Sequence, residues 1–327
     1  MMGDEKMRNL VILVADSLRF DYLPKSIKEK GTVIKTLTQA TYTPPSFASL
    51  ISGLSPENHN VRWFFDSFDT SKATVFDYFD NYCFFDHPTD PMSKIVLRKF
   101  ANNLDLKTIH EPFVWVERLM DTHTPYGEIK HGNEIPSNVT HSIDRTQIGD
   151  PTKYSNLKKA YRKGVKNLEE HFWMHVRELK ERGILDRTLV VLTSDHGELL
   201  GERVYLTKRR GHSWPICRQL VEVPTVFLNY KIQAQCMRTI DIVPTCLDVL
   251  GIQTSETFDG RSIIKNDVFE GKVLGRIHGI HGYYYISEWK YNELKKRFEP
   301  KGFDEKIRLI RCDIDRYLFA LKNKIKK

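Results

Sequence analysis

The chain contains four short apolar runs that are separated by polar stretches. The run at residues 8–15 is rich in Val, Ile and Leu and almost continuously apolar, and residues 112–120 and 188–193 form a second and a third candidate strand. This pattern is typical of strands that are buried on both faces of a parallel sheet. A fourth run, at residues 222–228, predicts a further, shorter strand. The pattern therefore indicates a buried central sheet.

A long amphipathic stretch lies between the second and third runs. Apolar residues recur there every three to four positions from Leu157 to Leu179, which predicts a helix with one stripe facing the core. Gly183 marks the end of this helix. Strands that alternate with helices predict an α/β fold, with a mostly parallel, doubly wound sheet and helices on both faces.

Reactive side chains follow three of the predicted strands. Asp16 ends the first strand, Asp121 the second, and Asp195 with His196 the third. Because the carboxyl ends of parallel strands share one edge of a sheet, we expect these residues to be neighbours in space. The polar residues 124–155 predict a long loop over that edge, and loops of this length are usually functional or disordered.

The cysteines and the lengths of the apolar runs indicate the cellular compartment. The five cysteines are scattered and form no CxxC pair, which is typical of a reducing cytosol without disulfides or a thiolate metal site. No apolar stretch approaches the roughly 18 residues of a membrane span. We therefore expect a cytoplasmic protein.

Most of the net charge of +8 lies at the C-terminus. Residues 290–327 contain 13 Lys and Arg against six Asp and Glu, a net charge of +7. Such a tail could make a peripheral contact with an anionic membrane, and the alternative is a solvated helical face. No nucleic-acid partner is expected.

The residues at the strand ends suggest a metal site. Two carboxylates and an imidazole, from Asp16, Asp195 and His196, suit Zn²⁺, Mn²⁺ or Mg²⁺ to different degrees. An aspartate at a strand end can also be a plain helix cap, so both interpretations of Asp16 stay open.

A candidate nucleophile lies in the stretch "TYTPPSFASLISG" at residues 41–53. Pro44 and Pro45 preset the backbone for a short helix of small residues, which places Thr43 at the start of that helix. A hydroxyl there can act as a nucleophile if a metal lowers its pKa. Thr43 could equally be a helix cap.

Seven ordered blocks resemble the sulfatases and their relatives in the alkaline phosphatase superfamily. They are "VADSLRFDYL" (14–23), "TPPSFASLISGLSPENHNV" (43–61), "DTHTPYG" (121–127), "LTSDHGELLGE" (192–202), "EVPTVFL" (222–228), "TIDIVPTCLDVLGI" (239–252) and "FDGRSI" (258–263). The resemblance implies a catalytic α/β domain over residues 1–265. A short C-terminal subdomain with an antiparallel extension and the basic tail would then occupy residues 266–327.

The resemblance also implies a metal centre. In this family pattern Thr43 stands at the nucleophile position, and Asp16, Asp195, His196 and Thr43 itself would hold a divalent ion. Relatives with two metal ions have an Asp at the end of this strand and a His four residues after it. Here the histidine nearest to Asp121 is His123, only two residues on, so we expect one ion, of Mn, Zn, Mg or Ca.

Three further residues match family positions that contact the substrate. His123 would contact the transferred group or the leaving group, as a catalytic residue. Lys208 or His212 would bind a small anionic ester substrate, and the alternatives for His212 are a further metal ligand or a structural histidine.

Two departures from the family motif change the expected chemistry. Threonine cannot be converted to the aldehyde that sulfatases use, and Phe47 replaces the arginine of the motif. We therefore expect a metal-dependent hydrolase of phosphoric mono- or diesters that uses Thr43. The alternatives are a phosphotransferase acting on a lipid or glycan headgroup, an atypical sulfuric ester hydrolase, or a binding protein that kept the fold.

Overall fold

The structure is a computed structural model of the 327-residue chain. It describes residues 7–86, 92, 104–124, 126, 154–205, 207–264, 267–276 and 284–325. The loop predicted at residues 124–155 lies outside the described residues except at its two ends.

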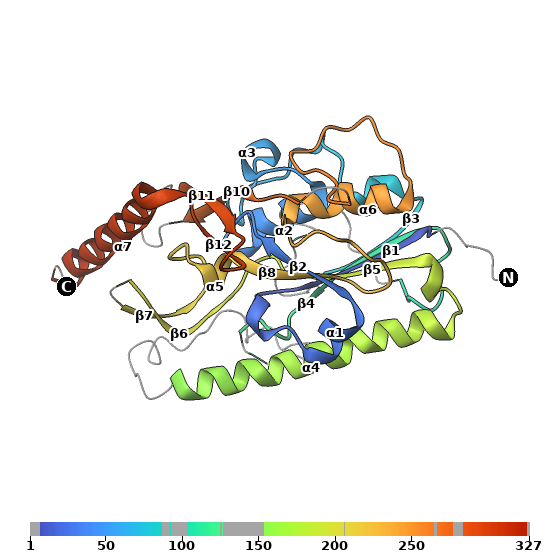
Figure 1. The fold of residues 1–327 in the computed structure, drawn as a ribbon, viewed down its shortest axis with the longest axis horizontal. Helices are drawn as coiled ribbons and strands as arrows, with labels where there is room; N and C mark the ends of the chain where they lie inside the picture. Colours follow the sequence, from blue (N-terminus) through green and yellow to red (C-terminus); the bar gives the residue numbers. More distant parts are fainter. Residues whose placement is uncertain are drawn as a thin grey trace.

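A seven-stranded sheet forms the centre of the molecule, in the order β3-β4-β1-β5-β8-β2-β9 (Figure 1). These strands are β3 (Asn81–Phe85), β4 (Phe113–Leu119), β1 (Asn9–Ala15), β5 (Thr188–Thr193), β8 (Glu222–Phe227), β2 (Thr32–Leu37) and β9 (Cys236–Arg238). The first four are parallel to one another, as are β2 and β9, whereas β8 is antiparallel to both of its neighbours. The prediction of a mostly parallel sheet is confirmed.

Helices cover both faces of this sheet (Figure 1). Helix α4 (Tyr154–Glu181) and α1 (Lys25–Lys30) lie on one face, where Leu168 and Phe172 pack against β1 and β4. Helices α2 (Thr43–Ser52) and α6 (Ile242–Leu250) lie on the other face with Phe47 and Val243 in their core. The predicted stripe of α4 is therefore confirmed.

Short elements connect these layers. They are α3 (Pro56–His59), α5 (Arg218–Val221) and 3-10 turns at Phe20–Tyr22, Val75–Tyr78, Leu185–Arg187 and Thr239–Asp241. A hairpin of β6 (Leu199–Val204) and β7 (Thr207–Gly211) extends beyond the carboxyl end of β5.

The C-terminal part forms a small antiparallel sheet followed by a helix. The sheet contains β10 (Glu270–Arg276), β11 (Tyr284–Asn292) and β12 (Arg297–Pro300), and the helix is α7 (Gly302–Ile325). This sheet agrees with the antiparallel extension that was expected within residues 266–327. Helix α7 lies at the opposite end of the molecule from the start of β1 (Figure 1). Among the described residues, no helix is both long and apolar enough to cross a membrane.

Candidate active site

The carboxyl ends of β1 and β5 bring the predicted residues together. One potential ligand atom from each of Asp16, Asp195 and His196 lies within 4.8 Å of the others, and all three residues are buried. The parallel register of β1 and β5, with Val14 opposite Thr193, places Asp16 beside the turn that follows β5. The expectation is confirmed for Asp16, Asp195 and His196, whereas Asp121, which was expected beside them, is not part of this cluster.

A strained turn after β1 holds the two aspartates in place. Ser17 has φ +67°, in the left-handed region that non-glycine residues seldom adopt. In this conformation the Ser17 backbone N–H donates to Asp195 Oδ1 (3.2 Å) and its hydroxyl donates to Asp16 Oδ1 (2.8 Å). Tyr161 of α4 braces the turn by donating to the Ser17 carbonyl (2.7 Å). The turn thus links both carboxylates through one residue.

Thr43 begins α2 and faces the same cluster. Its Oγ1 lies 3.3 Å from Asp16 Oδ2, to which it donates, and 3.1 Å from His196 Nε2. One turn later, the Ser46 hydroxyl donates to the carbonyl of Asp195, which anchors the start of the helix. Pro44 and Pro45 remove two of the four free amide donors at this helix start. The position of Thr43 therefore agrees with the sequence expectation, but this helix start has fewer donors for an anion than most.

The orientation of His196 fixes its tautomer. Its Nδ1 lies 2.9 Å from the carbonyl of Gly197 and so carries the hydrogen, which leaves the lone pair of Nε2 facing Thr43. Burial, together with the neighbouring His212, lowers the pKa of His196 to about 3. Gly197 has to be glycine because a Cβ there would lie 1.9 Å from the carbonyl oxygen of Gln219. A neutral imidazole with a free Nε2 can bind a metal or accept a proton.

Arg118 contacts Asp16 from the adjacent strand β4. Its guanidinium lies 2.7 Å and 3.1 Å from Asp16 Oδ2 through two nitrogens, and 3.8 Å from Asp86. Burial by itself would raise the pKa of Asp16, but the nearby His123 and Arg118 lower it well below its usual value. Asp16 is therefore held as a carboxylate by a buried arginine.

Sequence reasoning missed Arg118, although a signal was present. The run "PFVWVERLM" carries the charged pair Glu117–Arg118 inside an otherwise apolar strand. Charged residues are almost never fully buried unless they are paired, so such a pair in a central strand indicates partners on neighbouring elements.

Two histidines lie beside the cluster. The ring of His212, just after β7, is centred 4.4 Å from the ring of His196 and 5.4 Å from that of His123. The fully buried Glu198 accepts from His212 Nδ1 at 3.4 Å. Although burial opposes it, Glu198 raises the pKa of His212 to about 9. Glu198 was not singled out from the sequence, although it directly follows the strand-end motif.

Comparison with known proteins now identifies the family. The family model described as Sulfatase matches residues 62–252, which is more than half of the chain. The low-salt glycan biosynthesis sulfotransferase Agl7 of Haloferax volcanii is 31% identical over 291 residues, covering 82% of this chain and 69% of that protein. The chain therefore belongs to the sulfatase family.

Solved structures of low sequence identity share the fold of this sulfatase-family chain. A putative sulfatase from Bacteroides thetaiotaomicron has a TM-score of 0.65 at 14% identity, covering 98% of this chain and 94% of that one. A phosphonate monoester hydrolase of Agrobacterium radiobacter has a TM-score of 0.64 at 13% identity, with the same coverage. The resemblance stated from the sequence motifs is confirmed, and the chain is a hydrolase or a transferase of this superfamily.

The remaining predicted residues occupy different places in this sulfatase-family fold. Lys208 lies on β7 and is exposed, so its role in substrate binding stays a prediction. Asp121 accepts from His171 of α4 at 2.8 Å, a histidine that the sequence did not suggest. Phe47, in place of the motif arginine, is buried and stacks on Phe84, so this position supplies no charge to the site.

The donor set fits a divalent cation. Asp195 Oδ2 is buried and has no hydrogen-bond partner, although it lies 3.4 Å from His196 Nε2. Burial and the neighbouring Asp16 raise the pKa of Asp195, since two carboxylates crowd one another. Two carboxylates and a neutral imidazole are ligands that divalent metals accept. A bound metal ion would therefore relieve the repulsion between the two carboxylates and give Asp195 Oδ2 a partner.

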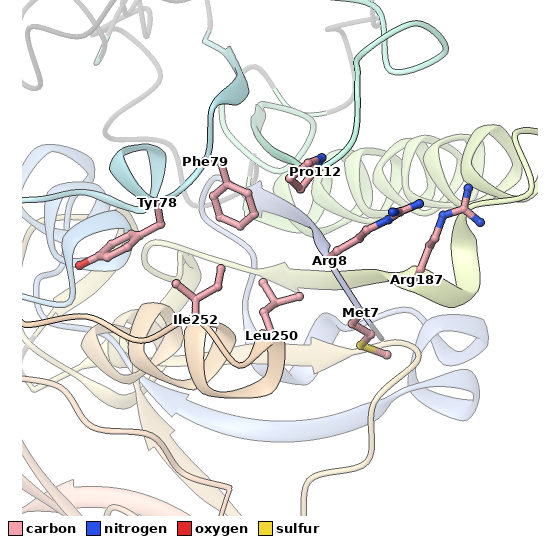
Figure 2. A pocket seen from close by; sticks show the side chains of 8 residues that line it. All are labelled: Met7, Arg8, Tyr78, Phe79, Pro112, Arg187, Leu250 and Ile252. Atoms are coloured by element: carbon pink, nitrogen blue, oxygen red, sulfur yellow. The ribbon is translucent and has the colours of Figure 1, made fainter. Parts of the chain in front are cut away.

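A cavity of about 510 Å³ lies away from this cluster, near the amino ends of β1, β4 and β5 (Figure 2). Its walls are mostly apolar, with Phe79 and Leu250 among them, and Arg8 and Arg187 lie at one side. Both arginines bind Glu111, so their charge is already engaged. The cavity has no residue in common with the candidate site.

Proposed function

We propose that this sulfatase-family chain is a metal-dependent hydrolase that cleaves phosphoric mono- or diesters through Thr43. The observation that carries the proposal is the place of the Thr43 hydroxyl, which lies between Asp16 Oδ2 and His196 Nε2 at the start of α2. Threonine cannot be converted to the aldehyde of the usual sulfatase mechanism, which favours direct attack by the hydroxyl.

Each residue of the site has a role in this proposal. Asp16, Asp195 and His196 would hold the metal ion, which would lower the pKa of the Thr43 hydroxyl and neutralise anionic oxygens of the substrate. Thr43 Oγ1 forms a bond to phosphorus while the bond from phosphorus to the leaving oxygen breaks, and Asp16 Oδ2 is the first acceptor of the hydroxyl hydrogen. Arg118 orients Asp16 and holds it as a carboxylate until it accepts this hydrogen.

The two histidines beside the cluster complete the site. His212, hydrogen-bonded to Glu198, would contact oxygens of the transferred group, and His123 would contact the leaving group. Water then cleaves the phosphothreonine: its hydroxyl joins phosphorus, which leaves as phosphate from a monoester or as a phosphate monoester from a diester, and its other hydrogen restores the Thr43 hydroxyl.

The relationship to Agl7 favours a second candidate. That relative is named as a sulfotransferase of glycan biosynthesis and aligns over 82% of this chain. In this candidate Thr43 would pass a sulfuryl group from an ester to a hydroxyl of a glycan, with the acceptor hydroxyl taking the place of water.

One experiment separates the two candidates. The purified chain is incubated with aryl phosphate, bis-aryl phosphate, aryl phosphonate or aryl sulfate, each with Mn²⁺, Zn²⁺, Mg²⁺ or Ca²⁺, and with or without a glycan acceptor. Radioactive phosphorus or sulfur in the substrate reports any covalent adduct on the peptide that contains Thr43. Hydrolysis of a phosphorus ester with a labelled Thr43 peptide supports the first candidate. Turnover of the sulfate alone, stimulated by the glycan, would replace it with the second.

A further inference from the structure

Helix α7 exposes a continuous apolar face. Its residues are spaced alternately four and three positions apart and are 36–74% exposed: Phe303, Ile307, Ile310, Ile314, Tyr317 and Leu321. At 3.6 residues per turn, this spacing places them within about 80° of the helix circumference. We call this set the apolar face of α7. An apolar surface of this extent in one place usually marks an interaction site.

The body of the protein holds α7 by a different side. Leu309 is buried in the core shared with β11 and β12. Asp313 is also buried and accepts from Arg209 and from Trp214 Nε1 (3.0 Å). These contacts orient the helix, and they leave the apolar face uncovered by the described residues.

One basic residue lies at each border of the apolar face. Lys306 and Arg311 are exposed, and helical geometry places one at each border of the face. Asp304 and Asp315 lie farther around the helix than Arg311 does. Residues 316–327 contain five Lys or Arg and no Asp or Glu. The helix therefore combines an apolar stripe with cationic borders and a basic end.

This combination fits an anionic lipid surface. An amphipathic helix with Lys and Arg beside its apolar face lies in the plane of the membrane interface, with the apolar residues among the acyl chains. Long basic side chains at the borders then reach the headgroup phosphates. A parallel pair of α7 helices would instead bring two basic ends together, and their repulsion opposes that arrangement of a second copy. An antiparallel pair is an outcome that the test below distinguishes.

We propose that α7 docks this protein on an anionic membrane surface through its apolar face and its basic end. The proposal is independent of the reaction that the site performs. It also has a geometric consequence, because Arg209 of β7 ties α7 to the hairpin that leads into His212. Docking by α7 would hold that side of the candidate active site close to the lipid headgroups.

Vesicle flotation with the full chain tests the proposal. The vesicles are phosphatidylcholine alone, or phosphatidylcholine with about 30 mol% phosphatidylglycerol. We expect binding to the anionic vesicles that weakens as salt is added, and little binding to the neutral ones. The double variant Ile310→Glu, Ile314→Glu should lower the partition constant at least about 100-fold, since each buried isoleucine contributes about a factor of ten.

A matched control keeps the test specific. Leu294 lies in the turn between β11 and β12 and is 98% exposed, so Leu294→Glu adds one negative charge, half of that in the double variant, at an exposed apolar position outside the face. This variant should bind vesicles as the unmodified chain does, and an unchanged thermal unfolding midpoint shows that all variants are folded.

Three results would overturn the proposal. The first is equal binding of the double variant and the unmodified chain. The second is equal binding of the unmodified chain to neutral and anionic vesicles. The third is an unmodified chain that is a dimer in light scattering and binds no vesicles, together with a double variant that is a monomer. That result would make the apolar face a contact between two copies of the chain.

Discussion

Charged groups lie at both ends of strands β1, β4 and β5. They are paired with one another at the amino ends, whereas a carboxylate oxygen at the carboxyl ends has no hydrogen-bond partner. At the amino ends, Arg8, Glu111 and Arg187 each lie within two residues of the start of a strand. Both oxygens of Glu111 accept from Arg187, at 2.8 Å and 3.0 Å, and this arginine lowers the pKa of Glu111 to about 2. These three charged groups are therefore paired with one another and do not need an added ion.

The carboxyl ends differ because carboxylates are crowded there. Asp16 is paired with Arg118, but Asp195 Oδ2 is buried without a hydrogen-bond partner. An unpaired buried oxygen of this kind costs stability unless a ligand satisfies it. The cavity of about 510 Å³ lies at the amino ends, where the charges are paired. The candidate active site at the carboxyl ends is therefore recognised by its unpaired buried oxygen and not by the volume of a cavity.

The largest expected effect is on catalysis. Thr43→Ala removes the proposed nucleophile and should lower kcat at least about 1,000-fold, with little change in the unfolding midpoint. Thr43→Ser keeps a hydroxyl at the same place and should retain measurable turnover. Full activity of Thr43→Ala on the best substrate of the ester panel would show that the hydroxyl is not the nucleophile.

Arg118→Gln should cause the largest loss of stability. It leaves Asp16 buried without its cation, and breaking such a pair costs about 3 kcal/mol or more in the free energy of unfolding. Added Mn²⁺ or Zn²⁺ should restore more stability in this variant than in the unmodified chain, because a metal ion can supply the missing charge. Denaturant unfolding with and without metal measures both effects.

The satisfied end supplies the control for Arg118. Arg187→Gln removes a partner of Glu111 that is only partly buried, so the loss should be about 1 kcal/mol or less. Added Mn²⁺ or Zn²⁺ should not restore the stability of the Arg187→Gln variant. Equal metal rescue of the two variants would contradict the contrast between the two ends.

Asp195→Asn should separate metal binding from folding. The change removes one carboxylate of the cluster, so affinity for the metal should fall at least about 100-fold in calorimetry. Stability without metal should stay the same or rise, because a buried and unpaired charge is lost. Glu111→Gln at the other end should have the reverse profile, with lower stability and unchanged metal affinity.

The smallest effect is a pH dependence on the α4 side of the sheet. His175 is buried, and although burial opposes it, Glu117 at 2.7 Å raises the pKa of His175. A histidine whose pKa is raised on folding stabilises the fold below its unfolded pKa of about 6.5, and this contribution is lost as the pH rises through the folded pKa.

His175→Gln tests this dependence. The variant should lose more stability at about pH 6 than at about pH 9, because only the protonated histidine gains from Glu117. Denaturant unfolding at the two pH values measures the difference. A loss of stability that is equal at both would show that the pair does not titrate in this range.

Much of the architecture was predictable because local patterns determine it. The apolar runs of β1, β4 and β5, the stripe of α4 and the position of Thr43 before two prolines all follow from the periodicity and chemistry of neighbouring residues. The strand-end rule then predicted that Asp16 and Asp195 would meet. By contrast, strands β2, β3 and β9 were not predicted. In β2, Lys35 and two threonines interrupt the apolar residues, and β9 has only three residues, so the periodic signal of both is weak.

The C-terminal helix shows where local signals were ambiguous. Residues 304–324 carry mixed strand and helix signals, and the structure forms α7 there. Packing decides the outcome, because Leu309 and Asp313 are held by the small sheet and by the β7 region.

The sequence by itself determined the layers, the family and the set of candidate ligands, because periodicity and ordered motifs are properties of the chain. Only the tertiary structure decided how the charges are paired. Arg118 reaches Asp16 across two strands, Glu198 reaches His212 across a hairpin, and Asp195 Oδ2 is left without a partner. Pairing depends on distances between segments far apart in the chain, and those distances exist only after the sheet has formed.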